Sequence, residues 1–455
     1  MLKRTIKTFV ARLFTAPTKG PVHYSHDQHG IDRRLVSRHA IKVCEVLQQH
    51  GYEAYVVGGA VRDLIAGLEP KDFDVATNAT PEQIRPLFRR ARIIGRRFKL
   101  VHVVFGREII ETSTFRAADT ESQKTDAHGR ILHDNQYGEL VDDANRRDFT
   151  LNALYYDPTS ETVIDYHQGV NDLKNRVVRI IGDPTTRYRE DPVRMLRAVR
   201  FAAKLDATIE SSTHAPIQSL APLIANVPES RLFDELLKLL ACGHAMQCLE
   251  QLYAEQLHRD LLPYLESSLN DPEQRAFLEM ALARTDARVR SGRSISPSFL
   301  FATLLWKPVR AEWEQRKADK QPPVQALADA SDAVIAQQAK VMPIQRRFQT
   351  DMREIWFMQA RFDRVNSRSV WRLMEQPRFR AAVDFLQLRA EGKEVDSVEA
   401  QWWMDLADTN SDETRADMIA SHIAPRSQKR TRRRRVRTRR PHAHKNVANK
   451  APSTE

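Results

Sequence analysis

The alternation of apolar and polar residues predicts helices and strands in turn along the first third of the chain. Between residues 37 and 50 apolar residues recur at helical spacing, and Gly51 ends the run. Residues 54–57 predict a strand, and residues 61–65 again follow the helical period. Residues 71–76 alternate charged and apolar positions, which is typical of a strand with one polar face. We therefore expect helix, strand, helix and strand in this order.

A second group of patterns completes the predicted N-terminal unit. Residues 81–88 form a short helical pattern that starts with proline. Residues 93–105 and 108–115 predict two strands that turn at Gly106, and the polar residues 116–137 predict a loop. Together these patterns predict an α/β (α+β) unit with a mixed, mainly antiparallel sheet.

Helical periodicity dominates the remainder of the chain. From Asp191 onward strand patterns are sparse, so we expect an all-helical C-terminal region. No apolar run reaches the roughly 18 residues that span a bilayer, so we expect no integral membrane segment. The clearest predicted helices are residues 192–205, 230–240, 273–283 and 324–340.

The net charge of +12 comes from one segment of the chain. Residues 426–450 hold twelve of the 71 Lys and Arg residues and no acid, so the other 59 balance the 59 Asp and Glu residues. A block of like charges does not collapse, and it binds phosphates by releasing their counterions. It predicts a disordered Arg-rich tail over residues 426–455 that contacts nucleic acid.

The N-terminal residues and the cysteines indicate the compartment. The first residues are basic but lack the long apolar stretch of a secretory signal, so we expect a mobile basic arm over residues 1–30. Cys44, Cys242 and Cys248 are too few and too scattered for a disulfide framework, and they complete no zinc site. We therefore expect a reducing, cytoplasmic location.

Two residue groups near the second predicted strand can carry chemistry. Gly58 and Gly59 stand between a strand and a helix, where glycine lets backbone amides approach a phosphate and Arg62 offers donors to its oxygens. A Gly-Gly turn into a helix is common, however, and does not by itself indicate a site.

The second group is a pair of aspartates. In a strand Asp72 and Asp74 point to the same face, while Phe73 and Val75 face the core. Two convergent carboxylates repel each other unless a cation neutralises them, and Mg²⁺ does so between carboxylates and nucleotide phosphates. Two solvated aspartates near a turn are the plain alternative, and the spacing after Gly58 and Gly59 favours the metal site.

The order of strand, Gly-Gly, helix and Asp-x-Asp resembles the nucleotidyltransferase superfamily that includes polymerase beta. More narrowly, residues 52–205 resemble the class II branch, which contains bacterial poly(A) polymerases and CCA-adding enzymes. The resemblance implies a catalytic head that takes ATP as substrate and uses Mg²⁺, or alternatively Mn²⁺, at Asp72 and Asp74.

Three further segments carry the resemblance. Residues 145–154 are similar to the family's Arg-Arg-Asp-Phe-Thr motif, which implies nucleotide binding by Arg147 and a third functional carboxylate at Asp148. From the residues alone, Asp148 is expected to cap the entry to an apolar helical run. Glu111, on the second strand of the expected hairpin, is the rival third carboxylate.

Residues 187–198 resemble the segment that selects the incoming base. Here Asp191, Arg194 and Arg197 recur every three residues along one helix face. An aspartate accepts from an exocyclic amine while an arginine donates to the neighbouring ring nitrogen, which both adenine and cytosine satisfy. Asp191 and Arg194 by themselves therefore do not distinguish ATP from CTP.

Residues 93–103 look like the segment that distinguishes poly(A) polymerases from CCA-adding enzymes, through Gly95, Arg96, Arg97, Phe98 and His102. This match implies template-independent polyadenylation of RNA 3′ ends, feeding RNA decay and turnover. The alternatives are a CCA-adding or A-adding transfer RNA nucleotidyltransferase and an inactive RNA-binding relative.

These expectations define an architecture of a nucleotidyltransferase head followed by helices and a basic tail. We expect a monomer that binds ATP and RNA, and the sequence identifies no protein partner. The expected parts are an N-terminal arm (1–30), a catalytic head (31–175), a helical neck that reads the base and binds RNA (176–270), a helical RNA-binding body (271–425) and the tail (426–455).

Overall fold

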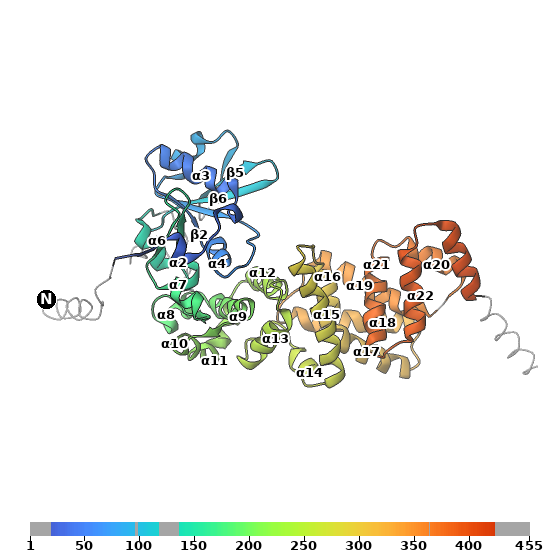
Figure 1. Ribbon diagram of the computed structural model, residues 1–455. Coiled ribbons are helices and arrows are strands. Elements are labelled where there is room, and N and C mark those ends of the chain that lie inside the picture. The colour runs from blue at the N-terminus through green and yellow to red at the C-terminus, as the bar shows by residue number, and fades with distance from the viewer. Residues whose placement is uncertain (1–19, 96–98, 118–135, 364, 424–455) are drawn as a thin grey trace, which may run out of the picture. The chain divides into compact units, whose positions relative to one another are not determined.

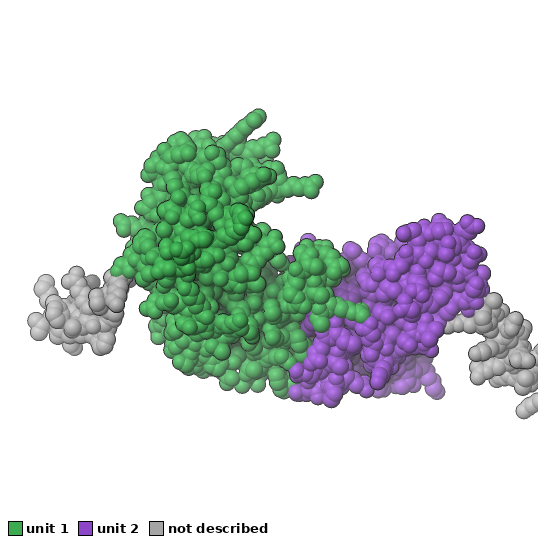
Figure 2. Space-filling model, in the orientation of Figure 1, with its two compact units in different colours: residues 1–266, 283–295, 341–343 green, residues 267–282, 296–340, 344–455 purple. Residues whose placement is uncertain are grey.

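The computed structural model describes residues 20–95, 99–117, 136–363 and 365–423. The predicted tail and the first 19 residues of the predicted arm lie outside these ranges, as does most of the predicted loop 116–137. The chain divides into two compact units, coloured separately in Figure 2. Unit 1 comprises residues 1–266, 283–295 and 341–343, and unit 2 comprises the remainder.

An eight-stranded sheet forms the centre of the first part of unit 1 (Figure 1). Its spatial order is β1-β8-β7-β2-β3-β6-β5-β4, and only the pair β3 and β6 is parallel. The expected mixed, mainly antiparallel sheet is therefore confirmed. The strands are β1 Val22–Tyr24, β2 Ala54–Val57, β3 Asp74–Thr77, β4 Ala91–Ile94, β5 Leu100–Phe105, β6 Glu108–Thr114, β7 Leu154–Asp157 and β8 Thr162–Asp165.

The two faces of the sheet are buried in different clusters. Val56 of β2 and Val75 of β3 pack into one cluster together with Leu47 of α3. The next residues along these strands, Val57 and Ala76, belong to a second cluster that includes Leu140 and Ala144 of α6 and Tyr155 of β7. Successive side chains of a strand point to opposite faces, which places helices on both sides. The helices here are α2 His26–His29, α3 Arg38–Gln49, α4 Gly59–Ile65, α5 Pro81–Ile84, α6 Leu140–Arg146 and α7 Gly169–Lys174.

Short helices form the remainder of unit 1, with one small parallel strand pair. The amphipathic helix α9 buries Met195, Leu196, Val199 and Phe201 on its inner face. The elements are β9 Val177–Val178, α8 Pro184–Glu190, α9 Val193–Leu205, β10 Thr208–Ile209, α10 Ser211–His214, α11 Ile217–Leu220, α12 Glu229–Leu240 and α13 Ala245–Ala254.

The described part of unit 2 contains helices and no strand, which confirms the expected helical region. Its core includes Phe362, Phe379 and Trp403, which lie edge to face at 4.8 and 6.1 Å between ring centroids. The helices from the end of unit 1 onward are α14 Leu265–Leu269, α15 Pro272–Arg290, α16 Pro297–Leu304, α17 Trp306–Ala318, α18 Pro323–Ala339, α19 Arg346–Phe362, α20 Ser367–Met374, α21 Phe379–Glu391 and α22 Ser397–Asp408. No helix in the described ranges is long and apolar enough to cross a bilayer.

Several local predictions are wrong in informative ways. The single strand expected over residues 93–105 is two antiparallel strands, β4 and β5, and the strand expected to begin at residue 71 begins only at Asp74. The helix expected over residues 81–88 is α5 followed by the 3₁₀ turn η2 (Arg85–Leu87).

The apolar run after Asp148 is not a helix. It is the 3₁₀ turn η3 (Thr150–Asn152) followed by β7, so Asp148 does not cap an α-helix. Leu154, Tyr155 and Tyr156 of β7 are all fully buried between two neighbouring strands. A strand covered on both faces is apolar at every position and loses the alternating pattern that identifies strands.

We predict that Gly169→Ala destabilises unit 1 by about 1–3 kcal/mol, the usual range for a side chain without room. A Cβ at Gly169 would lie 2.2 Å from the carbonyl oxygen of Thr150, so α7 would have to separate from η3. Thermal unfolding would report the loss, with Gly20→Ala as the control because a Cβ at Gly20 would meet no atom within 4 Å. Equal melting temperatures for the two variants would contradict this packing.

Candidate active site

Gly58 forms the turn between β2 and α4. Its φ of +65° lies in the left-handed region, where residues with a side chain are strained. The Gly58 N–H donates to the carbonyl of Leu154 on β7 at 3.3 Å. A Cβ at Gly58 would lie 3.2 Å from Nη1 of Arg147. Glycine here therefore lets the backbone pass close to a guanidinium, and Gly59 follows as the first residue of α4.

The register of the sheet sets Asp74 beside this turn. Asp74 pairs with Val57 on β2 in the antiparallel direction and with Glu111 on β6 in the parallel direction. Paired residues of neighbouring strands point to the same face, so the carboxylates of Asp74 and Glu111 share one face of the sheet. His102 of β5 lies next in the row, with Nε2 3.3 Å from Oε1 of Glu111.

Asp72 lies just before β3 and is exposed, while Phe73 between the two aspartates is turned into the core. Loss of hydration, followed by the charges of Glu111 and Asp72, raises the pKa of Asp74 to about 6 against the opposing effect of Arg147. Among the described residues, neither Asp72 nor Asp74 forms an ion pair or a side-chain hydrogen bond. No described side chain therefore pairs directly with either carboxylate.

This donor set fits a magnesium or manganese ion in its chemistry. Such ions prefer carboxylate oxygens, and sites for nucleotide complexes use one or two carboxylates together with phosphate oxygens. Within the described ranges, no three His, Cys, Asp or Glu side chains already converge as a complete metal cage. Asp72 and Asp74 thus supply part of a coordination sphere that a nucleotide would complete.

Asp148 is held inside a network of donors. Its Oδ2 accepts from Nε and Nη2 of Arg197 at 2.6 Å, and its Oδ1 accepts from the Asn152 amide and the Phe149 N–H at 2.9 and 2.8 Å. Burial raises the pKa of Asp148, but the charge of Arg197 and these hydrogen bonds outweigh burial and hold it at about 2. The carboxylate is ionised and fixed against α9. Of the two rival carboxylates, only Glu111 is paired with Asp74 in the sheet.

Arg62 and Arg147 both lie among protein partners. Arg62 is 5% exposed, and it donates to Asp63 at 2.7 Å and to the Asn152 side chain at 2.7 Å. Arg147 donates to Asp143 at 3.0 Å and to the Tyr155 hydroxyl at 2.9 Å. The structure therefore brings Arg147 to Gly58 and Asp74, whereas it places the Arg62 guanidinium in the interior.

The expected base-reading residues line one pocket of about 380 Å³. Oδ2 of Asp191 accepts from Arg231 at 2.8 Å, while its buried Oδ1 has no hydrogen-bond partner among the described residues. A buried acceptor without a partner is unfavourable until a donor reaches it. Arg194 is held by Glu190 at 2.9 Å and by the carbonyl of Arg187 at 2.7 Å, and Arg197 is held by Asp148.

Sequence reasoning missed several residues that position this pocket. Arg231 lies on α12, forty residues after Asp191, and Glu235 of the same helix is bonded to Arg200 of α9 at 2.6 Å. No local pattern connects residues so far apart. Glu190 stands next to Asp191 in the expected motif and is the one member of this group that its spacing could have indicated.

The segment expected to separate adenine addition from CCA addition is described only in part. Gly95 has a φ of +86° and His102 lies on β5 beside Glu111, but residues 96–98 lie outside the described ranges.

Three regions of the chain match models of domains from one protein family. Residues 54–179 match the poly A polymerase head domain, residues 206–269 match a probable RNA- and SrmB-binding site of polymerase A, and residues 319–440 match the polymerase A arginine-rich C-terminus.

Individual relatives give the same result. Poly(A) polymerase I of Salmonella typhi is 45% identical over 390 residues, which cover 83% of this chain and 84% of the relative. A CCA-adding enzyme of Lactobacillus helveticus is 37% identical over 222 residues, which cover 49% of this chain and 54% of that enzyme. A solved tRNA-processing enzyme in an apo form shares the fold, with a TM-score of 0.55 at 20% identity over 84% of this chain and 99% of its own. From its matched regions and its identity to curated relatives, the chain belongs to the poly(A) polymerase family of nucleotidyltransferases.

Proposed function

We propose that this protein transfers AMP from ATP to the 3′-hydroxyl of RNA without a template and releases pyrophosphate. The supporting observation is the start of β3, where Asp72 and Asp74 lie without described cation partners and the sheet sets Asp74 beside Glu111 and the Gly58 turn. The identity of 45% to a relative named Poly(A) polymerase I, along most of both chains, supports the same activity.

In this proposal Asp72 and Asp74 hold a magnesium ion, or manganese in its place. When bound, the ion neutralises charge on the triphosphate and on the leaving oxygens. The turn at Gly58 and Gly59 brings its backbone close to two guanidinium groups, since a Cβ would lie 3.2 Å from Arg147 at the first glycine and 3.5 Å from Arg62 at the second. Arg147 contributes a fixed positive charge, and its bonds to Asp143 and Tyr155 keep it in place.

Glu111 and Asp148 take different roles. We assign Glu111 to the metal side, because the sheet register sets it next to Asp74. Asp148 instead orients Arg197 on α9, because its oxygens accept from Arg197, Asn152 and the Phe149 N–H. Arg62 supports this arrangement from the interior by joining α4 to Asn152.

Adenine is read in the pocket at the start of α9. The free Oδ1 of Asp191 accepts from the exocyclic amine. Asp191 lies in extended conformation between α8 and α9 and not on the helix face where it was expected, while Arg194 lies on the first turn of α9 with a fixed guanidinium. Arg231, which also lines the pocket, holds the Asp191 side chain, and Glu190 holds the Arg194 side chain. Because cytosine offers the same donor and acceptor, CCA addition to transfer RNA is the second candidate function, and the similarity to CCA-adding enzymes supports it.

An extension assay separates the two functions. With ATP alone we expect long products on an unstructured oligoribonucleotide, and with CTP alone we expect none on transfer RNA that lacks its 3′ CCA. Gel electrophoresis of both reactions gives the answer. Efficient CTP addition to the transfer RNA, with no growth of the generic RNA, would identify a CCA-adding enzyme instead.

Substitutions at the three carboxylates test their separate roles. We expect Asp74→Asn to lower the extension rate at least about 100-fold, since a loss of several kcal/mol of charge stabilisation has that effect. Glu111→Gln should raise the Mg²⁺ concentration for half-maximal rate about tenfold, within the range for groups that support a metal. Asp148→Asn should raise the KM for ATP and leave the Mg²⁺ requirement unchanged.

The control for this series is Asp27→Asn, because the Asp27 side chain is 99% exposed at the start of α2. It should match the unsubstituted protein in rate, KM and Mg²⁺ requirement. If Asp148→Asn shifted the Mg²⁺ requirement and Glu111→Gln did not, the two assignments would have to be exchanged.

Asp191→Ala tests base recognition. A hydrogen bond to a charged group contributes about 1.5–3 kcal/mol, so its loss should raise the KM for ATP by roughly 10- to 100-fold. Arg231→Gln removes only the partner of Oδ2 and should have a smaller effect in the same steady-state assay. An unchanged KM for ATP in Asp191→Ala would rule out this residue as the acceptor.

A further inference from the structure

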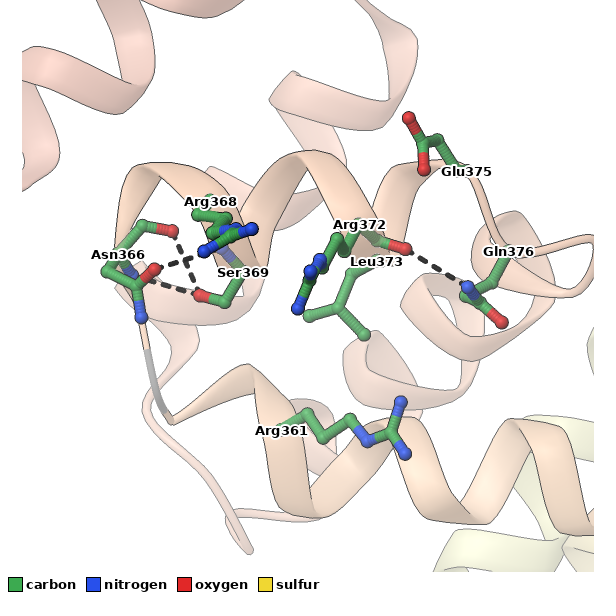
Figure 3. A pocket seen from close by; sticks show the side chains of 8 residues that line it. All are labelled: Arg361, Asn366, Arg368, Ser369, Arg372, Leu373, Glu375 and Gln376. Carbon is green, nitrogen blue, oxygen red and sulfur yellow. Dashed lines mark hydrogen bonds between the residues drawn. The ribbon is translucent and has the colours of Figure 1, made fainter.

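A second group of arginines in unit 2 lies far along the chain from the residues discussed above. Arg361 near the end of α19 and Arg368 and Arg372 of α20 line a pocket of about 630 Å³. Figure 3 shows Arg361 on one side of this pocket and the residues of α20 on the other. All three arginines are exposed, and Glu375 is the only acidic residue among the described residues of the lining.

These three guanidinium groups are distinguished by their lack of acidic partners. Among the described residues, none of them forms an ion pair, and Glu375 forms none either. Most other described arginines of unit 2 are bonded to a carboxylate. Because that bond uses some of their N–H groups, these arginines have fewer donors left for a ligand. The paired arginines include Arg275, Arg310, Arg316, Arg353, Arg378, Arg380 and Arg389.

Helix α20, which carries Arg368 and Arg372, is held in place although these two arginines repel each other. Arg368 and Arg372 are four residues apart on α20, where like charges disfavour the helix. Val370 and Leu373 of the same helix are buried in the core of unit 2, and the Asn366 and Ser369 side chains cap the first turn. The arginines are therefore held close together by apolar packing, and an anion between them would relieve their repulsion.

We propose that this pocket binds backbone phosphates of the RNA whose 3′ end is extended. The planar fork of arginine matches phosphate oxygens, and three separate, exposed guanidinium groups suit successive phosphates of a single strand. This inference depends on the proposed function for the identity of the ligand, while the pocket takes no part in the transfer step. It assigns to unit 2 an RNA contact formed by specific residues.

RNA affinity as a function of salt provides the test. The pocket variant is the full-length protein with Arg361→Gln, Arg368→Gln and Arg372→Gln. The control is the full-length protein with Arg316→Gln, Arg353→Gln and Arg380→Gln. The control loses the same charge from the same unit, but at arginines that form ion pairs. Fluorescence anisotropy measures binding of a labelled, unstructured oligoribonucleotide of about 20 nucleotides without ATP, from about 50 to about 300 mM KCl, the range in which phosphate contacts are salt-sensitive. Thermal unfolding is recorded for every variant.

We expect the pocket variant to lower the slope of log affinity against log salt by about 2, since each phosphate contact of a single strand contributes about 0.7. Its dissociation constant should rise about tenfold near 0.1 M salt, whereas the control should keep the original slope. Equal changes in both variants would show an effect of net charge only and overturn the proposal. If the triple variant unfolds, each single variant must lower the slope by about 0.7, and three unchanged slopes would also overturn it.

Extension kinetics keep this inference separate from the proposed function. The pocket variant should raise the KM for a long RNA, leave kcat unchanged and leave extension of a trinucleotide unaffected. A lowered kcat on the trinucleotide would place the residues in the reaction itself and contradict the proposal. If the unsubstituted protein extended no RNA, the proposed function would fail, while the binding measurement would still decide whether the pocket holds RNA.

Discussion

The candidate active site depends on the pairing of β3 with two neighbours in opposite directions. The antiparallel pairing with β2 sets Asp74 opposite Val57, the residue before the Gly58 turn, and the parallel pairing with β6 sets it beside Glu111. A shift of one residue in either register would turn Asp74 to the other face of the sheet, into the cluster that holds Val75. Burial of the Asp74 carboxylate in that apolar cluster would be costly, which opposes the shift.

Helix α9 is attached to α4 and to the segment before η3 through charged side chains. Arg197 is paired with Asp148, Lys204 is paired with Asp63 at 2.7 Å, and Arg62 spans Asp63 and Asn152. Buried ion pairs add little net stability, but removing one partner leaves a charge that is poorly solvated, so the set defines one arrangement of the helix. That arrangement fixes where Arg194 and the free oxygen of Asp191 lie relative to η3. The candidate base pocket is thus joined to Asp148, η3 and α4 through one network of ion pairs and hydrogen bonds.

Arginine serves two purposes in this protein, and the partners of each side chain separate them. In unit 1, Arg62, Arg147 and Arg197 are bonded to carboxylates and amides, and they position other groups. In unit 2, Arg361, Arg368 and Arg372 have no described acidic partner and lie on the surface around a pocket. The first group holds neighbouring side chains in position, and the second is free to bind an external anion. The sequence alone does not distinguish the two groups, because both are simply basic residues among apolar ones.

The sequence by itself determined the elements whose apolar period is regular, the helical C-terminal region and the family, because these follow from local patterns and ordered motifs. It also predicted that Asp72 and Asp74 belong to one site, since a spacing of two residues is a local relation. Only the tertiary structure decided which residues surround the two aspartates and the base pocket. It set Glu111 beside Asp74, fixed Asp148 to Arg197, buried Arg62 and supplied Arg231 from forty residues away. It also revealed β7, whose burial on both faces removes the alternation that a sequence pattern requires. Pairing across a sheet and ion pairing between helices join distant residues, and local periodicity carries no information about either.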